Sequence, residues 1–524
     1  MKKNDIITSA LLSLGMVAFA GCDGFLDKLP DNRAEIDTES KIQSLLVSAY
    51  PRNDFMLLTE FMSDNVDDMG AGNPYTDRFI DQVYSWSEIT ETDNESPENV
   101  WNASYYAIAA ANQALQAIEN LGGPSTTELK AAKAEALLCR AYNHFILTNL
   151  FCKSYNPSTS GKDLGVPYSE EPETTLVVHH ERGTVAEDYE RMDADIQEAL
   201  PLQADSYFSV PKYHFNKKAA YAFAARFYLF YQKWDKAEEY ASRCLGSAPE
   251  TMLRDWKATA EMTQTYDAIV SHFIDASLNC NLLLLTAYSK MGLAFGPYFL
   301  YSKYAHNNYI ATTEDALAAN IWKSGDYYMP PKVYKGTNLD KTVFWKLPYL
   351  FEYTDAVAGI GYYRTVYPAF WCDETLLVRA EARTMLEKFD EAAADLTLWM
   401  RNIVNTETVL DPSSIRRYYN AVKYSTWDSP TIKKKLSPSF DIGIETSVKE
   451  AMIQCVLGFR RIETLGQGLR WFDINRYGIG IDRRIIGADG EPEQVTDSLK
   501  IDDPRRALQI PRKVIDAGLE ANPR

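Results

Sequence analysis

A short motif that occurs twice in the chain limits its fold more than any other feature. Residues 233–237 read Lys-Trp-Asp-Lys-Ala, and residues 388–392 read Lys-Phe-Asp-Glu-Ala. Each copy follows a segment with helical apolar spacing, near 217–232 and near 374–387. Each therefore predicts a helix, a tight turn with an Asp cap and a second helix. A chain that repeats such hairpins is expected to be mainly α-helical.

The two hairpins carry small residues in matching places. Ala225 and Ala380 occupy equivalent positions of the first helices, where a small side chain lets two helices approach closely. The pattern is similar to that of tetratricopeptide hairpins, which bury their apolar faces by stacking on one another. The period is not constant along the chain, so a plain repeat array is not expected. Two unrelated helical hairpins are the alternative.

Helical spacing also runs through the N-terminal half. A helix is expected near 100–121, and Gly122-Gly123-Pro124 separates it from a second helix over 135–150 with a single apolar face. Thr184 and Glu187 form a capping box for a helix that reaches Leu200. Residues 153–175 are rich in Ser, Pro, Gly and Thr, and we expect them to form a long loop.

The middle of the chain has a different composition. Residues 298–371 hold 19 aromatic residues in 74 positions, about twice the 12% of the whole chain, without a long helical period. We therefore expect residues 281–370 to form loops with short helices and, in places, strands. A second irregular stretch is expected over 405–441, which contains three prolines. Loops on a rigid helical frame are a usual location for binding residues.

The N-terminus has the features of an exported protein. Lys2 and Lys3 precede a mostly apolar stretch over 6–20, which is shorter than the roughly 20 residues needed to span a bilayer and is typical of a secretory signal. Residues 19–22, Phe-Ala-Gly-Cys, resemble a bacterial lipobox, which implies cleavage before Cys22 and diacylglycerol on its sulfur. An ordinary signal with a coincidental cysteine is the alternative. The predicted organisation is a signal peptide over 1–21, a lipidated tether over 22–38 and a single domain over 39–524.

Charge and motifs exclude several classes of function. The formal net charge of −18 argues against binding to a nucleic-acid backbone, which requires a basic surface. The six cysteines after Cys22 are widely separated and form no CxxC pair, so no zinc finger or thioredoxin-type site is expected. The chain contains no HExxH, Walker A, dinucleotide-binding glycine or GxSxG motif. We expect no catalytic residues and no cofactor, although counting acidic residues does not exclude a glycosidase pair.

Several blocks of the sequence resemble the SusD/RagB family of outer-membrane nutrient-binding lipoproteins. They follow one another in the family's order, at residues 22–27 (Cys-Asp-Gly-Phe-Leu-Asp), 163–167, 182–185, 234–237, 377–382, 460–464, 468–476, 510–511 and 522–523. Phe459 and Gln467 stand where the family pattern often has Glu. Arg470, Asp473 and Arg476 have the spacing of helix neighbours, and we expect them to fix a C-terminal structural element.

The resemblance implies a mainly helical fold built on tetratricopeptide-like hairpins, with an irregular, loop-rich ligand-binding lobe. It also implies a lipoprotein of the outer membrane that faces the cell exterior. Such a protein captures an oligosaccharide and delivers it to a SusC-like TonB-dependent transporter, over which it sits as a lid. A peptide ligand or a tetratricopeptide-like scaffold for a protein partner is the alternative, and a secreted glycoside hydrolase is a third reading.

Sugar recognition requires flat apolar faces together with forked hydrogen-bonding groups. The aromatic-rich segment supplies the first, and the segment over 62–86 supplies the second. The predicted ligand-binding residues are Asp64, Asn65, Arg78, Trp86, Tyr298, Tyr301, Trp322, Tyr327 and Trp345.

Other conspicuous residues are expected to be structural. Trp101, Trp234 and Phe389 lie at positions of helices and hairpin turns that predict packing. The acidic cluster Asp64, Asp67 and Asp68 could bind calcium, but Val66 occupies a ligand position of an EF-hand loop. We therefore expect a solvated loop there and predict no metal site.

Overall fold

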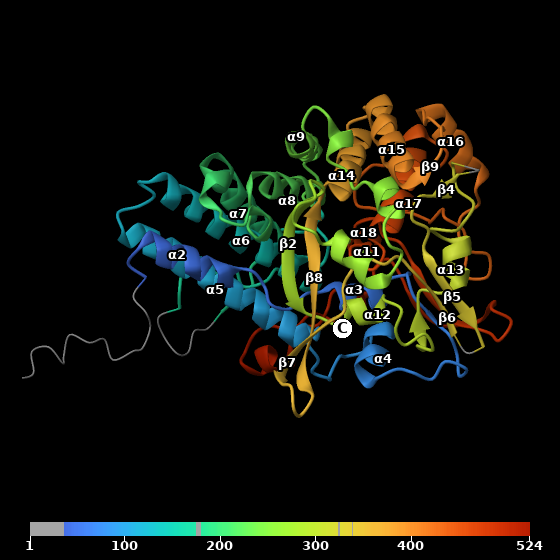
Figure 1. Cartoon of the computed structure of the whole chain (residues 1–524), viewed down its shortest axis with the longest axis horizontal. Coiled ribbons are helices and arrows are strands. Elements are labelled where there is room, and N and C mark those ends of the chain that lie inside the picture. The colour runs from blue at the N-terminus through green and yellow to red at the C-terminus, as the bar shows by residue number, and fades with distance from the viewer. Residues whose placement is uncertain (1–35, 174–179, 323–324, 338) are drawn as a thin grey trace, which may run out of the picture.

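The computed structural model describes residues 36–173, 180–322, 325–337 and 339–524 (Figure 1). The predicted signal peptide, Cys22 and the tether up to residue 35 lie outside the described residues. Among the helices that the structure describes, none is both long enough and apolar enough to cross a membrane.

Helices of the N-terminal half form one side of the molecule, on the left in Figure 1. α5 (Pro97–Asn120) packs against α6 (Thr127–Phe151), α7 (Val185–Ala199) packs against the other side of α6, and α2 (Glu39–Leu46) contacts α5. These helices agree with those expected from the apolar spacing. α5 and α7 differ from the prediction by a few residues at their ends, where helices are hardest to delimit. α6 begins at Thr127, eight residues before the expected start at 135.

Local capping explains where these helices begin. Thr184 accepts from the N–H of Glu187, and the N–H of Thr184 donates to the Glu187 carboxylate at 2.8 Å, so the predicted capping box is confirmed. The Ser96 side chain caps α5 by accepting from the N–H of Asn99, and Pro97 lies in its first turn, where a missing N–H costs nothing.

The repeated motif forms two helical hairpins, α8 (Lys217–Phe230) with α9 (Trp234–Leu245), and α14 (Cys372–Met385) with α15 (Phe389–Ile403). α9 packs against α14, so the hairpins lie side by side. Ala225 and Ala380 are fully buried, as expected for residues at close helix contacts.

The turns of the two hairpins have the same backbone geometry. Gln232 and Glu387 both adopt the left-handed conformation, with φ of 59° and 60°. The expectation of an Asp cap is wrong, because the residue at each N-cap is a lysine, Lys233 or Lys388, with no capping hydrogen bond from its side chain. The Asp of each motif lies in the first turn instead, where a negative charge is favourable beside the helix N-terminus.

The C-terminal helices pack around the second hairpin. α17 (Val448–Thr464) contacts α14, α15 and α16, and α18 (Arg470–Arg476) follows it. Arg460 binds Asp473 through two hydrogen bonds of 2.7 and 2.8 Å, and Arg476 binds the same carboxylate at 3.2 Å. The expected fixing of a C-terminal element by ion pairs is therefore confirmed.

A three-stranded sheet lies at the centre of the molecule, between the two groups of helices (Figure 1). Its order is β2 (Asn281–Tyr288), β8 (Ile360–Trp371) and β7 (Leu350–Asp355), all antiparallel. The prediction for residues 281–370 includes strands in places, and this part is confirmed, but the pairing of these strands into one central sheet is not predicted. β2 and β8 pair across a long stretch of sequence, and a short apolar run such as Leu282–Leu285 does not by its spacing distinguish a strand from a helix.

The second stretch expected to be irregular also contains a regular element. α16 (Pro412–Ala421) begins after Asp411, whose carboxylate accepts from the N–H groups of Ser413 and Ser414. Pro412 occupies the first turn, so this proline starts a helix rather than breaking one.

Shorter elements complete the fold. A four-stranded sheet has the order β11-β10-β1-β3, and two two-stranded ribbons pair β4 with β9 and β5 with β6. The remaining helices and strands are α3 (Met56–Met62), α4 (Arg78–Tyr84), α10 (Trp256–Ala260), α11 (Tyr266–Phe273), α12 (Met291–Ala294), α13 (Asn308–Thr313), α19 (Arg512–Asp516), β1 (Asp67–Asp68), β3 (Tyr304–Ala305), β4 (Asp326–Tyr327), β5 (Lys332–Gly336), β6 (Leu339–Val343), β9 (Val404–Asn405), β10 (Ile481–Ile486) and β11 (Pro492–Leu499).

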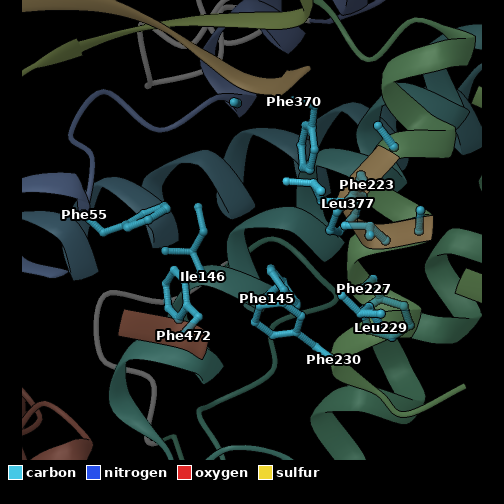
Figure 2. Close-up of a cluster of buried hydrophobic side chains, with 14 of the residues drawn as sticks. Phe55, Phe145, Ile146, Phe223, Phe227, Leu229, Phe230, Phe370, Leu377 and Phe472 are labelled. Carbon is cyan, nitrogen blue, oxygen red and sulfur yellow. The ribbon is translucent and has the colours of Figure 1, made fainter. Parts of the chain in front are cut away.

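The core joins the helices to the central sheet. Phe370, from β8, points toward Phe223 of α8, with 5.7 Å between their ring centroids, and Phe145 of α6 packs on Phe230 at 5.1 Å (Figure 2). The six cysteines of the described residues are free and buried, as expected for small apolar side chains. The surface loops are therefore carried by a packed core of helices and an antiparallel sheet.

Candidate functional site

Aromatic side chains from three segments meet on one part of the surface. The segments are the loop before α4, the stretch between α12 and β3, and the β7–β8 hairpin, all at the lower edge of the view in Figure 1. We call this surface the aromatic ridge, and its residues are Tyr75, Tyr298, Phe299, Tyr301, Tyr349, Phe351, Tyr353 and Tyr363.

The β7–β8 hairpin places its aromatic residues on one face. Phe351 and Tyr353 alternate along β7 and so point to the same side of the sheet, and Tyr349, just before the strand, continues the alternation. Phe351 pairs directly with Tyr363 of β8, with ring centroids 5.3 Å apart, and Tyr349 lies 5.8 Å from the same ring. Tyr353, at the outer end, is 61% exposed. The hairpin therefore projects a row of rings toward solvent.

Gly361 is needed for this row to form. It pairs with Tyr353, and a Cβ atom at position 361 would lie 2.1 Å from the carbonyl oxygen of Glu352 and 2.8 Å from the Phe351 ring. Only a residue without a side chain lets the two strands approach closely here.

A second group of rings lies beside the hairpin. Tyr75 stacks on Phe299 with centroids 4.2 Å apart and ring planes 7° from parallel, and Tyr301 meets Tyr75 edge-on at 5.4 Å. Tyr75 and Tyr301 remain 42% and 48% exposed. The backbone holds them together, because the N–H of Lys303 donates to the carbonyl of Tyr75 at 2.8 Å.

Tyr298 joins the two groups. Its ring meets Tyr349 edge-on at 5.1 Å, and its carbonyl accepts from the ammonium of Lys341 at 2.9 Å. Burial lowers the pKa of Lys341 to about 7. Burial and the neighbouring Asp77, Tyr301 and Tyr363 raise the pKa of Tyr75, so its hydroxyl stays protonated at neutral pH.

Charged groups border the rings. Arg78 is largely exposed and pairs with Glu91 at 3.2 Å. Lys290 binds Asp93 and also lies over the Tyr363 ring, 5.8 Å from its centroid. The surface therefore combines flat apolar faces with hydroxyl, guanidinium, ammonium and carboxylate groups, which is the combination that a polyhydroxylated ring requires.

The structure brings some of the sequence-predicted residues together and separates others. Tyr298 and Tyr301 belong to the ridge, and exposed Arg78, the first residue of α4, follows Tyr75 by three positions. Trp345 lies behind the ridge, half-buried, with its ring edge-on to Tyr266 at 5.8 Å and its indole N–H donating to the Tyr334 hydroxyl at 3.2 Å.

Two predicted aromatic residues, Trp322 and Trp86, are core residues, and a third, Tyr327, is half-buried against the core. Trp322 is only 5% exposed and packs against Tyr327 and Phe459. The hydroxyl of Tyr327 is itself buried. Trp86 is held between Arg483, whose guanidinium carbon lies 4.0 Å from the ring centroid, and the carbonyl of Met62, which accepts from its indole at 2.9 Å. Packing therefore covers Trp322, whereas Trp86 also lines a cavity of about 880 Å³.

Asp64 and Asn65 belong to a buried polar network. Asp64 accepts from Arg470 at 2.8 and 2.9 Å, and Asn65 accepts from Arg461 at 2.9 Å. Burial opposes ionisation, but Arg461 and Arg470 hold the pKa of Asp64 well below its usual range. Asn65 therefore has no surface to offer a ligand.

The acidic cluster is not a solvated loop, contrary to expectation. Asp64 is paired as described, and Asp67 binds Arg484 through contacts of 2.9 and 3.0 Å. Among the described residues, no group of three or more His, Cys, Asp or Glu side chains is placed to hold a metal ion. Asp67 thus fixes β1 to β10, and Asp64 and Asp67 line a cavity rather than an open loop.

Sequence reasoning missed most of the ridge. Tyr75, Phe299, Phe351, Tyr353 and Tyr363 were not among the predicted residues. The alternation of aromatic residues at 349, 351 and 353 is the strand pattern that could have revealed one face of the hairpin. Tyr75 carries no such signal, since only the fold brings it to Phe299.

Comparisons with known proteins agree with this fold. Residues 24–229 match the SusD-like family model described as "Starch-binding associating with outer membrane". None of the curated proteins is similar enough to the chain to count as a match.

Solved structures of similar fold cover nearly the whole chain. A SusD superfamily protein from Bacteroides thetaiotaomicron VPI-5482 has 19% identity and a TM-score of 0.59, over 93% of this chain and 100% of that one. A SusD superfamily protein from Bacteroides vulgatus ATCC 8482 has 18% identity and a TM-score of 0.61, over 93% and 98%. A SusD-like carbohydrate binding protein from the same organism has 15% identity and a TM-score of 0.60, over 92% and 96%.

Proposed function

We propose that this chain, which resembles SusD-like proteins over residues 24–229 and in its fold, binds an oligosaccharide at the aromatic ridge and delivers it to a SusC-like TonB-dependent transporter. The observation that carries the proposal is the exposure of Tyr75, which stacks on Phe299, and of Tyr301 beside a projecting aromatic hairpin. Exposed rings gathered from three segments are costly to leave in water, and a binding role explains why they lie on the surface.

The ridge offers both interactions that a sugar ring uses. The faces of Tyr301 and Tyr353 provide flat apolar contact with the C–H faces of a pyranose, and their hydroxyls can bond to the sugar. Arg78 provides a planar fork of donors suited to neighbouring hydroxyls. Because several rings lie in a row, an extended chain of sugar units would gain more binding free energy than a single unit.

Attachment to the outer membrane and transfer to a transporter belong to the same proposal. The lipobox-like residues 19–22 support a lipid anchor on Cys22, and the description of the matching family model supports the outer membrane, with the ridge facing the cell exterior. The helical hairpins, similar to tetratricopeptide units, would be the rigid frame of the mainly helical domain over 39–524. We propose a binding protein without catalytic activity.

The first test replaces two exposed rings of the aromatic ridge. In Tyr301→Ala and Tyr75→Ala, affinity for the sugar that binds should fall about tenfold, equivalent to about 1.4 kcal/mol. Binding is measured by affinity electrophoresis and calorimetry with maltoheptaose, cellohexaose, xylohexaose and mannohexaose, together with a reducing-sugar assay. Tyr213→Ala is the matched control, because Tyr213 is also exposed, at 38%, and is not part of the ridge.

Three results would contradict the proposal. Release of reducing ends would identify an enzyme instead. Binding that is unaffected by either ridge variant would place the ligand elsewhere. Binding of peptides from a casein digest, weakened by the same variants, with no sugar bound, would favour the peptide-binding alternative.

A further inference from the structure

Trp427 differs from every other tryptophan of this protein. The structure describes all ten tryptophans, and Trp427 is the only one that is exposed, at 38%. Trp234 and Trp345 are half-buried, and the remaining seven are buried. An indole is the largest apolar side chain, so one that remains on the surface of a folded protein is a candidate contact for a partner molecule.

The loop that carries Trp427 is held in a defined shape. The hydroxyl of Thr426 donates to Asp428 at 2.8 Å, and the N–H of Ser425 donates to the carbonyl of Lys433 at 2.7 Å. Lys433 in turn reaches into the core, where its ammonium donates to the carbonyl of Tyr419 at 2.9 Å. The indole is therefore presented by a braced loop between α16 and α17.

Trp427 lines a cavity of about 840 Å³. Residues from 425–427, 434–435, 478–482 and 498–503 form its walls. This volume lies in the range of small-molecule sites, about 300–1,000 Å³. No residue of the aromatic ridge lines this cavity, so the two surfaces are separate.

The charged side chains at the floor of the cavity are paired with one another. Lys434 binds Glu314 at 2.5 Å and lies 3.7 Å from Asp64. Arg484 binds Asp67 at 2.9 Å and Glu314 at 2.7 Å. A charged ligand would have to disrupt these pairs, whereas a neutral polyhydroxylated ligand can exchange hydrogen bonds with them without leaving a charge unpaired.

We propose that this cavity is a second sugar-binding site, which takes a neutral unit of an oligosaccharide. The face of Trp427 stacks on the sugar ring. Lys434, Arg484 and the hydroxyls of Ser425 and Ser498 bond to its hydroxyl groups. The site is independent of the aromatic ridge, so a glycan chain could be held at two places on one molecule, which would raise its overall affinity.

The exposure of a single indole makes the test specific to this site. The whole chain is treated with N-bromosuccinimide in the absence and presence of maltoheptaose, cellohexaose, xylohexaose or mannohexaose, and oxidation of each tryptophan is measured by peptide mass spectrometry. We expect Trp427 to be oxidised first without sugar and to be protected several-fold by at least one sugar. Fully buried Trp471 is the internal control for unfolding.

Variants separate this site from the ridge. Protection of Trp427 should persist in the double variant Tyr75→Ala, Tyr301→Ala, while Trp427→Ala should lower affinity for the protecting sugar in calorimetry. Val409→Ala, another exposed apolar residue away from this cavity, is the matched control. If no sugar protects Trp427, or if protection disappears in the ridge double variant, the second site is refuted whatever the ridge itself binds.

Discussion

Two buried carboxyl groups, Asp54 and Glu95, lie next to each other close to the ridge. Asp54 accepts from the N–H of Met56 at 2.8 Å, and Glu95 accepts from the N–H of Lys290, the residue whose ammonium lies over Tyr363. Burial raises the pKa of Asp54 to about 7, and burial together with the charge of Asp54 raises that of Glu95 to about 8. Each has one oxygen without a hydrogen-bond partner among the described residues. The pair therefore retains protons at a pH where exposed carboxyls have lost theirs.

This pair predicts that stability falls as pH rises. Between the ordinary carboxyl pKa of about 4 and the raised values of about 7 and 8, the native state binds more protons than the unfolded state. The free energy of unfolding should then decrease by about 1.4 kcal/mol per pH unit for each retained proton. Glu95→Gln keeps an acceptor for the Lys290 N–H and removes one ionisation, so its stability should depend less on pH.

Urea unfolding of the wild type and of Glu95→Gln across this pH range measures the difference. Glu261→Gln, at an exposed carboxyl, is the matched control and should follow the wild type. The same pH slope in Glu95→Gln and in the wild type would mean that Glu95 is already ionised in the native protein.

The sequence predicts residue types at the site better than residue identities. Tyr298 and Tyr301 were predicted because the segment over 298–371 is rich in rings, and they lie on the ridge. Trp322 was predicted by the same reasoning and is core. Composition cannot separate them, because burial depends on which distant segments cover a ring; here Phe459 of α17 covers Trp322.

At the scale of elements, the ridge depends on close approach of β7 and β8. In Gly361→Ala, the new methyl group would lie 2.1 Å from the Glu352 carbonyl oxygen, so the strands must separate or shift. We expect faster amide hydrogen exchange in β7 and sugar affinity reduced about tenfold. The core contacts of β8 near Phe370 lie at the other end of the strand, so the overall stability should change little.

Gly336→Ala is the matched control for that experiment. Gly336 also lies in a strand of a hairpin, β5, but its nearest neighbour is the Leu339 side chain at 3.6 Å, an ordinary contact. Hydrogen exchange by mass spectrometry should show little change in β5. Unchanged exchange in β7 of Gly361→Ala would show that the hairpin tolerates a side chain and that the ridge does not depend on this glycine.

Helices and strands differ in how well they could be predicted. α5, α6, α7 and the two repeated hairpins are encoded by spacing within each segment, and a local signal such as Thr184 with Glu187 marks where one begins. The central sheet is not encoded locally. β2 and β8 become strands because their backbones hydrogen-bond to each other and both strands pack against α8. A non-local pairing of this kind leaves no periodic trace in either segment.

At the scale of the whole molecule, ion pairs between distant segments are the feature that is hardest to predict from the sequence. The segment over 64–68 looks like a water-exposed acidic loop, yet Arg461, Arg470 and Arg484, from far along the chain, neutralise it. The net negative charge of the protein is therefore compatible with a core in which arginines pair with carboxylates. The two proposed sugar-binding surfaces then bind through aromatic rings and paired polar groups.

The proposed attachment of the molecule to a membrane depends on Cys22. Acyl chains contribute about 0.8 kcal/mol for each buried CH₂ group, and more than one chain is needed for a stable anchor. Cys22→Ser removes the sulfur that would carry the diacylglycerol, so the expressed protein should move from the membrane fraction to the soluble fraction.

Cys139→Ser is the control, because that thiol is buried in α6 and cannot be lipidated in the folded protein. Fractionation followed by mass spectrometry of the N-terminal peptide distinguishes the outcomes. Cys22→Ser protein that still fractionates with membranes would mean that the chain is held there by something other than this cysteine.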